Sequence, residues 1–172
     1  MERLGLIHVY TGAGKGKTTA ALGLAMRALG HGYRVAILGF CKHREDIGEE
    51  KLAQRLPDLF FRQFGSGCFI IGEPTEQDRQ SAREGWLLAQ ELLAGRYQLV
   101  ILDEISHVIN KGLLDVEEVI SRLAARPAGV EVVLTGRDMP EQLVAQADVV
   151  TEMVEIKHPY QRGIQARRGI EY

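Results

Sequence analysis

The sequence predicts an α/β domain built around a mostly parallel sheet. Strand-like and helix-like segments alternate along the chain, which is the pattern of parallel strands joined by crossover helices. The segments RVAILGF (34–40) and YQLVILDE (97–104) are largely apolar, as expected for strands that helices cover on both faces. A glycine-rich turn lies between the first expected strand and the first expected helix, a context in which α/β domains bind phosphate.

The individual elements follow from apolar spacing and from the residues that interrupt it. Strands are expected where apolar and β-branched residues run together, at 4–10, 34–40, 59–64, 97–104, 130–136 and 148–156. Helices are expected from helical spacing at 18–29, after a polar loop within 41–52, at 76–93 and at 114–125. Gly30 and Gly32 end the first helix. The glycine-rich stretch 65–75 is expected to be a loop, and the tail 157–172 has no clear periodicity.

Length and composition indicate a single domain, residues 1–172, that is long enough to bury a core. Charged residues make up 26% of the chain, and the net charge of −2 gives no electrostatic argument for nucleic acid as a partner. The two cysteines, Cys41 and Cys68, form no disulfide framework, so we expect a reduced, cytoplasmic setting. No apolar run approaches the roughly 20 residues of a membrane helix, and the amino terminus shows no signal peptide, so we expect no membrane partner.

The stretch VYTGAGKGKTT (9–19) looks like a Walker A loop, G-x-x-x-x-G-K-[ST], with one residue missing. Thr11 stands where the first glycine should be, and the glycine comes one position later. Amides of such a turn and of the helix start point at phosphate, and glycines let the backbone approach closely. Lys17 is expected to reach phosphate oxygens, and the Thr18 hydroxyl is the expected ligand of Mg²⁺. The loop residues predicted to bind ATP are Gly12, Ala13, Gly14, Lys15, Gly16, Lys17, Thr18 and Thr19.

The segment LVILDE (99–104) has the Walker B arrangement, an apolar strand that ends in two carboxylates. Asp103 or Glu104 would bind Mg²⁺ directly or through water. On its own the segment is equally a strand followed by an acidic helix cap, but beside a phosphate-binding loop it favours a nucleotide site. The two motifs predict binding of a nucleoside triphosphate and do not indicate which of its bonds breaks.

Three further residues are candidates for the same site, and Glu104 has a second possible role there. Glu104 and His107 are possible bases near the γ-phosphate, although a lone histidine at this spacing is more often a packing residue. Arg137, in LTGR, should lie at the carboxyl edge of the sheet, either neutralising phosphate charge or solvated in a loop. Arg27, on the first helix, is ambiguous from the residues alone, with a surface role favoured.

Several segments together resemble one family, the ATP:corrinoid adenosyltransferases. GAGKGKTTAALGLAMRALGHG (12–32) is similar to the start of these proteins, whose loop typically reads G-N-G-K-G-K-T-T, and LVILDEIS looks like their Walker B segment. LLDVEEVISRLAARP resembles their following helix, and VVLTGRDMPEQLVAQADVVTEM and IKHPYQRGIQARRGIEY look like their carboxyl-terminal part. The similarity covers nearly all of the chain, and the last segment belongs to no general P-loop pattern.

The resemblance implies a RecA-like P-loop fold, a homodimer and a specific reaction. The family transfers the 5′-deoxyadenosyl group of ATP to the Co(I) of a corrinoid, such as cobalamin or cobyrinic acid a,c-diamide, and releases triphosphate in cobalamin biosynthesis or salvage. Its nucleotide lies reversed, with the γ-phosphate where other P-loop enzymes hold the α-phosphate. The cofactor implied is Mg²⁺ (or Mn²⁺), and an external flavin-dependent reductant supplies Co(I).

The resemblance also assigns roles to residues of this sequence. Thr18 and Glu104 match metal-associated positions of the family, and Asp103 adjoins them. Arg27 and Arg137 match arginines near the nucleotide. Lys17 and Arg137 are the predicted catalytic residues because they would stabilise the departing triphosphate. In the loop 65–75, Phe69 and Ile70 are predicted to contact the corrinoid, and the alternative is that the apolar residues Phe69, Ile70 and Ile71 only pack the loop down.

The sequence departs from the family pattern in three places. Ala13 replaces the common asparagine of the loop. The chain starts almost at its first strand, whereas several members carry an amino-terminal helix that closes over the corrinoid, so we expect a more open site or closure by another segment. The loop 65–75 lacks the tryptophan of the family's Phe-x-Trp pair. Two alternative functions stay open from the motifs alone: an ATPase or kinase of RecA type that acts on the γ-phosphate, and a regulatory module that uses ATP as a switch.

Overall fold

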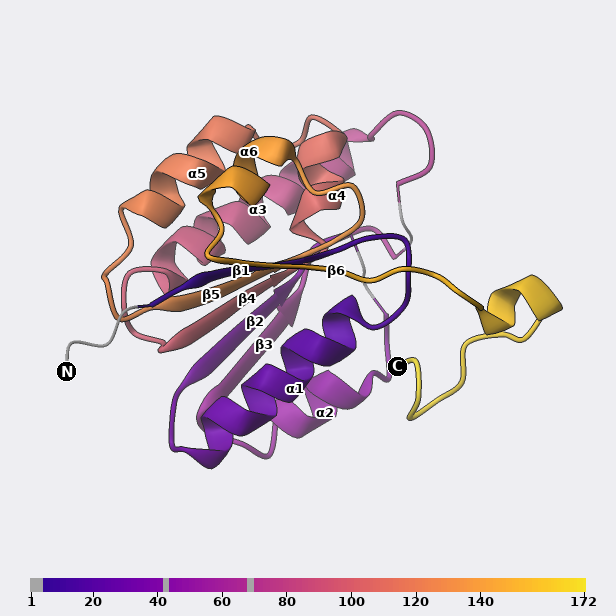
Figure 1. Cartoon of the computed structure of the whole chain (residues 1–172), viewed down its shortest axis with the longest axis horizontal. Coiled ribbons are helices and arrows are strands. Elements are labelled where there is room, and N and C mark those ends of the chain that lie inside the picture. The colour runs from indigo at the N-terminus through magenta and orange to yellow at the C-terminus, as the bar shows by residue number, and fades with distance from the viewer. Residues whose placement is uncertain (1–4, 42–43, 68–69) are drawn as a thin grey trace.

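The computed structural model describes residues 5–41, 44–67 and 70–172, which form a three-layer α/β sandwich (Figure 1). One sheet of six strands has the order β3-β2-β4-β5-β1-β6, and every pairing in it is parallel. The strands are β1 (Ile7–Thr11), β2 (Val35–Gly39), β3 (Leu59–Gln63), β4 (Leu99–Asp103), β5 (Glu131–Thr135) and β6 (Val149–Glu152). This arrangement agrees with the α/β, RecA-like P-loop class that the sequence predicts.

Helices cover both faces of the sheet. On one face lie α1 (Lys17–Gly30) and α2 (Gly48–Ala53). On the other lie α3 (Glu76–Leu92), α4 (Ile105–Asn110), α5 (Val116–Ala124) and α6 (Glu141–Gln146). After β6 the chain forms a short 3₁₀ turn, η1 (Pro159–Arg162), and then turns back toward the start of α1, where the carboxyl terminus lies (Figure 1). None of the helices in the described ranges is long and apolar enough to cross a membrane.

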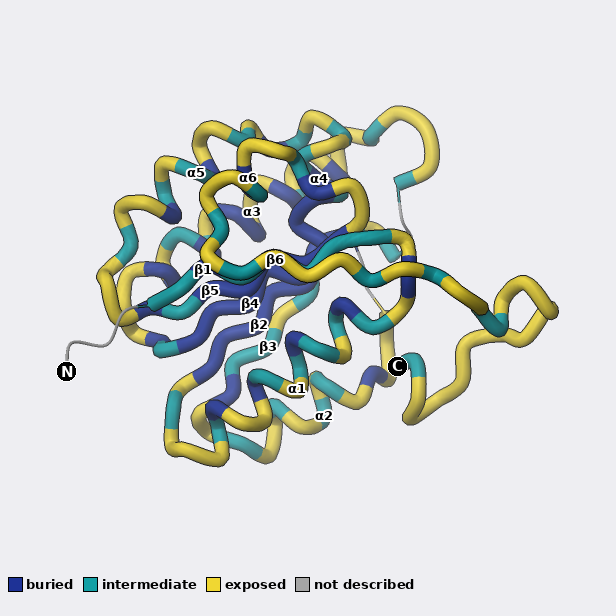
Figure 2. The backbone as a smooth tube through the Cα atoms, viewed as in Figure 1, coloured by how far each residue is buried: buried dark blue, intermediate teal, exposed yellow. Residues whose placement is uncertain are grey.

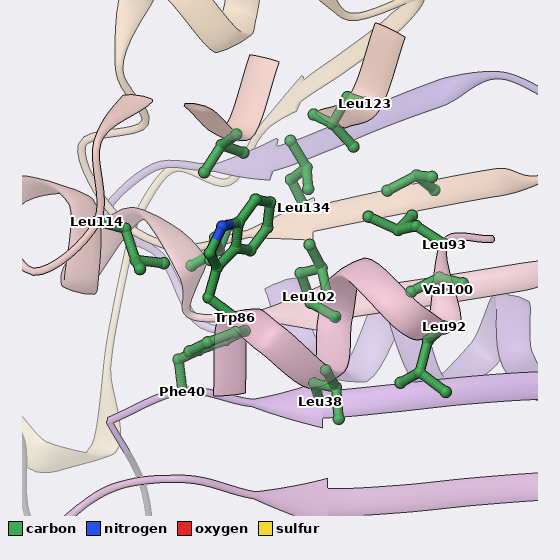
Figure 3. Packing of buried hydrophobic residues seen from close by; sticks show 14 of the residues in the cluster. Leu38, Phe40, Trp86, Leu92, Leu93, Val100, Leu102, Leu114, Leu123 and Leu134 are labelled. Atoms are coloured by element: carbon green, nitrogen blue, oxygen red, sulfur yellow. The ribbon is translucent and has the colours of Figure 1, made fainter. Parts of the chain in front are cut away.

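The core divides at the sheet because successive strand residues point to opposite faces. In β4, Val100 and Leu102 pack with α3 and α5, whereas Leu99 and Ile101 pack toward α1. Figure 3 shows Trp86 of α3 packed among the apolar side chains of the central strands, near Leu102. The strands β2 and β4 are buried along their length, whereas the edge strand β6 is largely exposed (Figure 2). Burial on both faces explains why the interior strands are continuous apolar runs.

Strand register decides which residues meet at the carboxyl edge of the sheet. Tyr10 at the end of β1 pairs with Thr135 at the end of β5, and Gly39 of β2 pairs with Asp103 of β4. Because parallel strands all finish at the same edge, the turns that follow β1, β4 and β5 open onto one region of the surface. Ligands of open α/β sheets bind at this edge.

The structure confirms the predicted strands and main helices and adds three short elements that the sequence analysis did not predict. These are α4, α6 and η1, of six, six and four residues. Segments this short span fewer than two turns, so their apolar residues show no helical period. The final strand is also shorter than expected, ending at Glu152, because the chain beyond it leaves the sheet to pack against the turn after β1.

Leu102→Ala tests the packing of this core. Leu102 is fully buried on β4, which lies between β2 and β5 in the sheet. The truncation should therefore leave a cavity and lower the free energy of unfolding by about 2–5 kcal/mol. Urea denaturation measures the change. Leu87→Ala on the solvent side of α3 is the matched control, since Leu87 is 62% exposed, and should change stability by less than about 0.5 kcal/mol. Equal effects of the two variants would contradict the assignment of the core.

Candidate active site

The phosphate-binding loop joins the end of β1 to the start of α1. Gly16, the residue before the helix, has φ 118° and provides no capping side chain, and the first turn of α1 contains no acidic residue. The amides of that turn are therefore not capped by a side chain, and the positive end of a 14-residue helix faces the loop. Lys17 is buried with its Nζ at the centre of the loop, donating hydrogen bonds of 2.7 Å to the carbonyls of Gly12 and Gly14. The loop is preformed to hold an anion.

The chain after β6 lies against this loop and explains two of its glycines. The Gly14 amide donates to the Met153 carbonyl at 2.7 Å, and the Met153 amide donates to the Thr11 carbonyl at 2.8 Å. A Cβ atom at Gly12 would stand 2.5 Å from the Met153 carbonyl oxygen, and one at Gly14 would stand 2.7 Å from it. Only glycine fits at these positions, and the Gly14 amide is already paired with protein rather than directed at phosphate.

Asp103 connects the loop to the sheet. Its Oδ1 accepts a hydrogen bond from the Thr18 hydroxyl at 2.8 Å and another from the Thr135 hydroxyl at 2.6 Å. The Thr135 hydroxyl also accepts from the Glu104 amide at 3.0 Å, so the ends of β4 and β5 are fixed to each other. The predicted metal-associated residues Thr18, Asp103 and Glu104 therefore lie together at the carboxyl edge.

The donors in this group fit a hard cation. A hydroxyl and carboxylates are the oxygen ligands that Mg²⁺ prefers, and Mg²⁺ usually takes only one or two carboxylates and fills its other positions with phosphate and water. In the described part of the chain, no three His, Cys, Asp or Glu residues are grouped as a ready-made metal cage. The group suits a metal that arrives with a nucleotide better than a permanently held ion.

Glu104 has an unusual backbone conformation for a residue that is not glycine. Its φ of 59° and ψ of 27° are left-handed, and they let β4 pass directly into α4 without a loop. Such a conformation costs energy and is concentrated at functional sites. Glu104 is buried at the sheet edge, beside Asp103. His107, the other candidate base, lies one turn later on α4 and is half-buried.

The two predicted arginines occupy different places. Arg137 is exposed in the turn after β5, at the carboxyl edge as expected, and its carbonyl accepts a hydrogen bond of 2.5 Å from the Ser106 hydroxyl. Arg27 lies ten residues after Lys17 on α1, about 15 Å along the helix axis. There it lines a cavity of about 240 Å³ with Tyr33 and residues at the starts of β4 and β5. Within one chain, the structure does not bring Arg27 to the phosphate loop.

The loop predicted to contact a corrinoid is only partly described, since Phe69 lies outside the described residues. Ile70 is half-buried against the larger core, which fits the packing role that the sequence left open. Among the described residues of this loop, Ile71 is a large apolar side chain that faces solvent, with 94% of its surface exposed. The loop is attached where Lys111 Nζ donates to the Gly72 carbonyl at 2.9 Å. Ile71 therefore exposes more apolar surface than Ile70 does.

Three residues of the site were not predicted. Thr135 could have been suspected, because it is a polar residue that ends an otherwise apolar strand segment. Met153 acts through its backbone, which leaves no signal in a side-chain pattern. Glu171 forms an ion pair of 2.8 Å with Lys15 of the loop, and its position near the end of an aperiodic tail gave no indication of that contact.

Comparison with known proteins identifies relatives along the whole chain. A family model described as ATP:corrinoid adenosyltransferase BtuR/CobO/CobP matches residues 3–172. A corrinoid adenosyltransferase of Pseudomonas aeruginosa is 36% identical over 173 residues, which cover 99% of this chain and 85% of the relative. One of Escherichia coli K12 is 37% identical over 172 residues, covering 99% and 87%, and one of a Sinorhizobium species is 39% identical over 175 residues, covering 99% and 82%.

Gly14→Ala tests the contact between the loop and the chain after β6. The added methyl group would collide with the Met153 backbone, so the loop must shift and its affinity for ATP should fall by about tenfold or more. Isothermal titration with magnesium ATP measures the dissociation constant. Gly23→Ala in α1 is the matched control, since nothing lies within 4 Å of its Cβ position. Unchanged ATP affinity in Gly14→Ala would remove the close approach from the description of the site.

Proposed function

The chain belongs to the ATP:corrinoid adenosyltransferase family, and we propose that it transfers the 5′-deoxyadenosyl group of ATP to the Co(I) of a corrinoid and releases triphosphate. The observation that carries this proposal is the phosphate-binding loop. It is preformed around Lys17 and fixed by Thr18 to Asp103, in a chain that matches the family from residue 3 to residue 172. Roles in cobalamin biosynthesis or salvage and a cytoplasmic location are part of the same proposal.

The proposed chemistry asks the protein to position two reactants and stabilise a leaving group. Co(I) is itself a strong nucleophile, so no side chain has to activate it. A cobalt–carbon bond forms at C5′, the C5′–oxygen bond breaks, and triphosphate leaves with the electron pair while cobalt is formally oxidised to Co(III). The amides of the loop and of α1, with Lys17 and Lys15, supply positive charge where the triphosphate departs. Arg137, exposed at the same edge, is positioned to add to it.

The shortened loop suits a nucleotide held for attack at the sugar rather than at the γ-phosphate. The Gly14 amide is taken by Met153, so the cradle differs from a loop whose amides all face phosphate. We propose that the triphosphate fills the loop in the reversed orientation implied by the family, leaving C5′ toward the corrinoid. Thr18, Asp103 and Glu104 would hold Mg²⁺ (or Mn²⁺), which when bound neutralises charge on the phosphates.

The other participants are proposed on the same basis. The exposed Ile71 gives the loop 70–75 an apolar contact for the corrinoid. An external flavin-dependent reductant is proposed to deliver Co(I). The working form is proposed to be a homodimer. In this dimer, Arg27 of one copy is available to the site of the other copy.

The product of the reaction tests the function. The protein is incubated with magnesium ATP and a chemically reduced corrinoid, and the phosphate product and the corrinoid spectrum are recorded. Triphosphate together with an alkyl-cobalt spectrum is the expected result. ADP or free phosphate formed without a corrinoid would point to an ATPase or kinase, and tight ATP binding without turnover would point to a regulatory module. Either of these outcomes would overturn the proposal.

Lys17→Ala should lower adenosyl transfer by at least about 10²- to 10³-fold, because it removes a buried cation from the proposed leaving-group site. ATP binding should be largely lost as well, since Lys17 also holds two carbonyls of the loop. Initial rates of alkyl-cobalt formation and an ATP titration measure the two effects. Arg96→Ala, an exposed cation just before β4 at the opposite edge of the sheet, is the control and should retain activity. Full activity in Lys17→Ala would remove the site assignment.

Ile71→Ser should raise the KM for the corrinoid severalfold and leave the ATP dissociation constant unchanged. The reason is that Ile71 is exposed, so its replacement removes apolar contact area without disturbing the core. Steady-state kinetics with the corrinoid as the varied substrate separate the two constants. Leu87→Ser, at an exposed apolar residue of α3, is the control. An unchanged KM for the corrinoid would show that this loop is not the corrinoid contact.

A further inference from the structure

The carboxyl-terminal tail returns to the phosphate loop. Between β6 and η1 the chain runs away from the sheet, and after η1 it turns back, so that its end lies near α1 and α2 (Figure 1). The tail makes two contacts with the segment that follows β2: Arg168 Nε lies 3.2 Å from Asp46 Oδ2, and the Arg44 guanidinium lies 5.3 Å from the ring centre of Tyr172. A third contact, between Glu171 and Lys15, reaches the phosphate loop itself. The tail therefore bridges two loops at the carboxyl edge of the sheet.

Glu171 is held in place by its own segment. The Arg167 amide donates to Glu171 Oε2 at 2.8 Å, and the Arg167 guanidinium donates to both carboxylate oxygens, at 3.1 and 3.2 Å. The Glu171 amide donates in return to the Arg167 carbonyl at 2.9 Å. The Glu171 side chain is 19% exposed, and its Oε1 accepts from Lys15 Nζ at 2.8 Å. A small turn of the tail thus presents a fixed negative charge to a lysine of the loop.

We propose that Glu171 is a positioning residue that holds Lys15 when the loop is empty and competes with the polyphosphate chain for it. Lys15 would exchange Glu171 for phosphate oxygens when a triphosphate binds, and would return to Glu171 when the triphosphate leaves. The inference rests on the proposed function, because it concerns affinity for the triphosphate product of that reaction. Its consequence is that Glu171 weakens triphosphate binding and favours product release.

The charges at this end of the tail support competition. Triphosphate is strongly anionic, so a carboxylate paired with a loop lysine both repels the ligand and occupies a cation that would otherwise contact it. Hydrogen bonds from Arg167 and then Lys15 lower the pKa of Glu171 to about 2, so the carboxylate stays ionised at neutral pH. Protonation of Glu171 therefore does not break its ion pair with Lys15 at neutral pH. The pair is instead broken by a competing anion that binds Lys15. The contacts to Asp46 and Arg44 keep the tail beside the site when Lys15 moves.

The affinity for inorganic tripolyphosphate tests the inference without any corrinoid. Binding of magnesium tripolyphosphate is measured by titration at fixed ionic strength for the intact protein and for three single variants. Glu171→Gln should bind about two- to fivefold more tightly, as expected from loss of an ion pair that solvent screens through the 42% exposed Lys15. Glu171→Asp keeps the charge and should stay closer to the wild type. Glu76→Gln, which breaks the exposed Arg83–Glu76 pair of α3, is the matched control and should have no effect.

A double-mutant cycle with Lys15→Gln shows whether the effect passes through the lysine. In the Lys15→Gln background, the added Glu171→Gln change should leave tripolyphosphate affinity nearly unaltered. Equal tightening in both backgrounds would make Glu171 a general repulsive charge and overturn the inference, as would unchanged or weaker binding in Glu171→Gln alone. If the wild type binds neither ATP nor tripolyphosphate, both the proposed function and this inference are overturned. If the wild type binds tripolyphosphate but Glu171→Gln does not bind it more tightly, only the inference is overturned.

Discussion

One carboxylate oxygen connects the separate parts of this site. Oδ1 of Asp103 accepts hydrogen bonds from a threonine in the first turn of α1 and from a threonine at the end of β5. The helix start, the end of β4 and the end of β5 are thereby fixed to one another by polar side chains, of which Asp103 and Thr135 are buried. Such a network is rigid when all its members are paired, because leaving any of them unpaired in the interior carries a large desolvation penalty. This network fixes the position of the phosphate loop.

The network depends on strand order, which separates β1 from β4 by one strand. Although β5 lies between them, Thr18 at the start of α1 reaches Asp103 directly, and Thr135 at the carboxyl end of β5 donates to the same oxygen. The apolar layers on both faces keep these strand ends in register, so packing far from the surface decides the geometry of the polar edge. A site of this kind is specified by the whole sheet rather than by its loops alone.

The sequence predicted the layers of this fold and the two central motifs because both have strong local signals. Buried parallel strands are continuous apolar runs, and a strand, a glycine-rich turn and a helix in succession predict an anion site. What the sequence did not reveal depends on contacts between distant segments. Thr135, Met153 and Glu171 reach the site through register, backbone pairing and the return of the tail. The placement of Arg27 away from the loop likewise depends on helix length, which a motif does not express.

The pairing of the phosphate loop with Met153 has a consequence for how the site opens. The partner segment extends from β6, an exposed edge strand of four residues that pairs only with β1. Edge strands with few buried contacts undergo local unfolding more readily than interior ones. Whenever the end of β6 frays, Gly14 loses its hydrogen-bond acceptor and the loop loses one wall. The order of the phosphate loop therefore depends on an exposed edge strand, and a ligand that orders the loop must also restrain that strand.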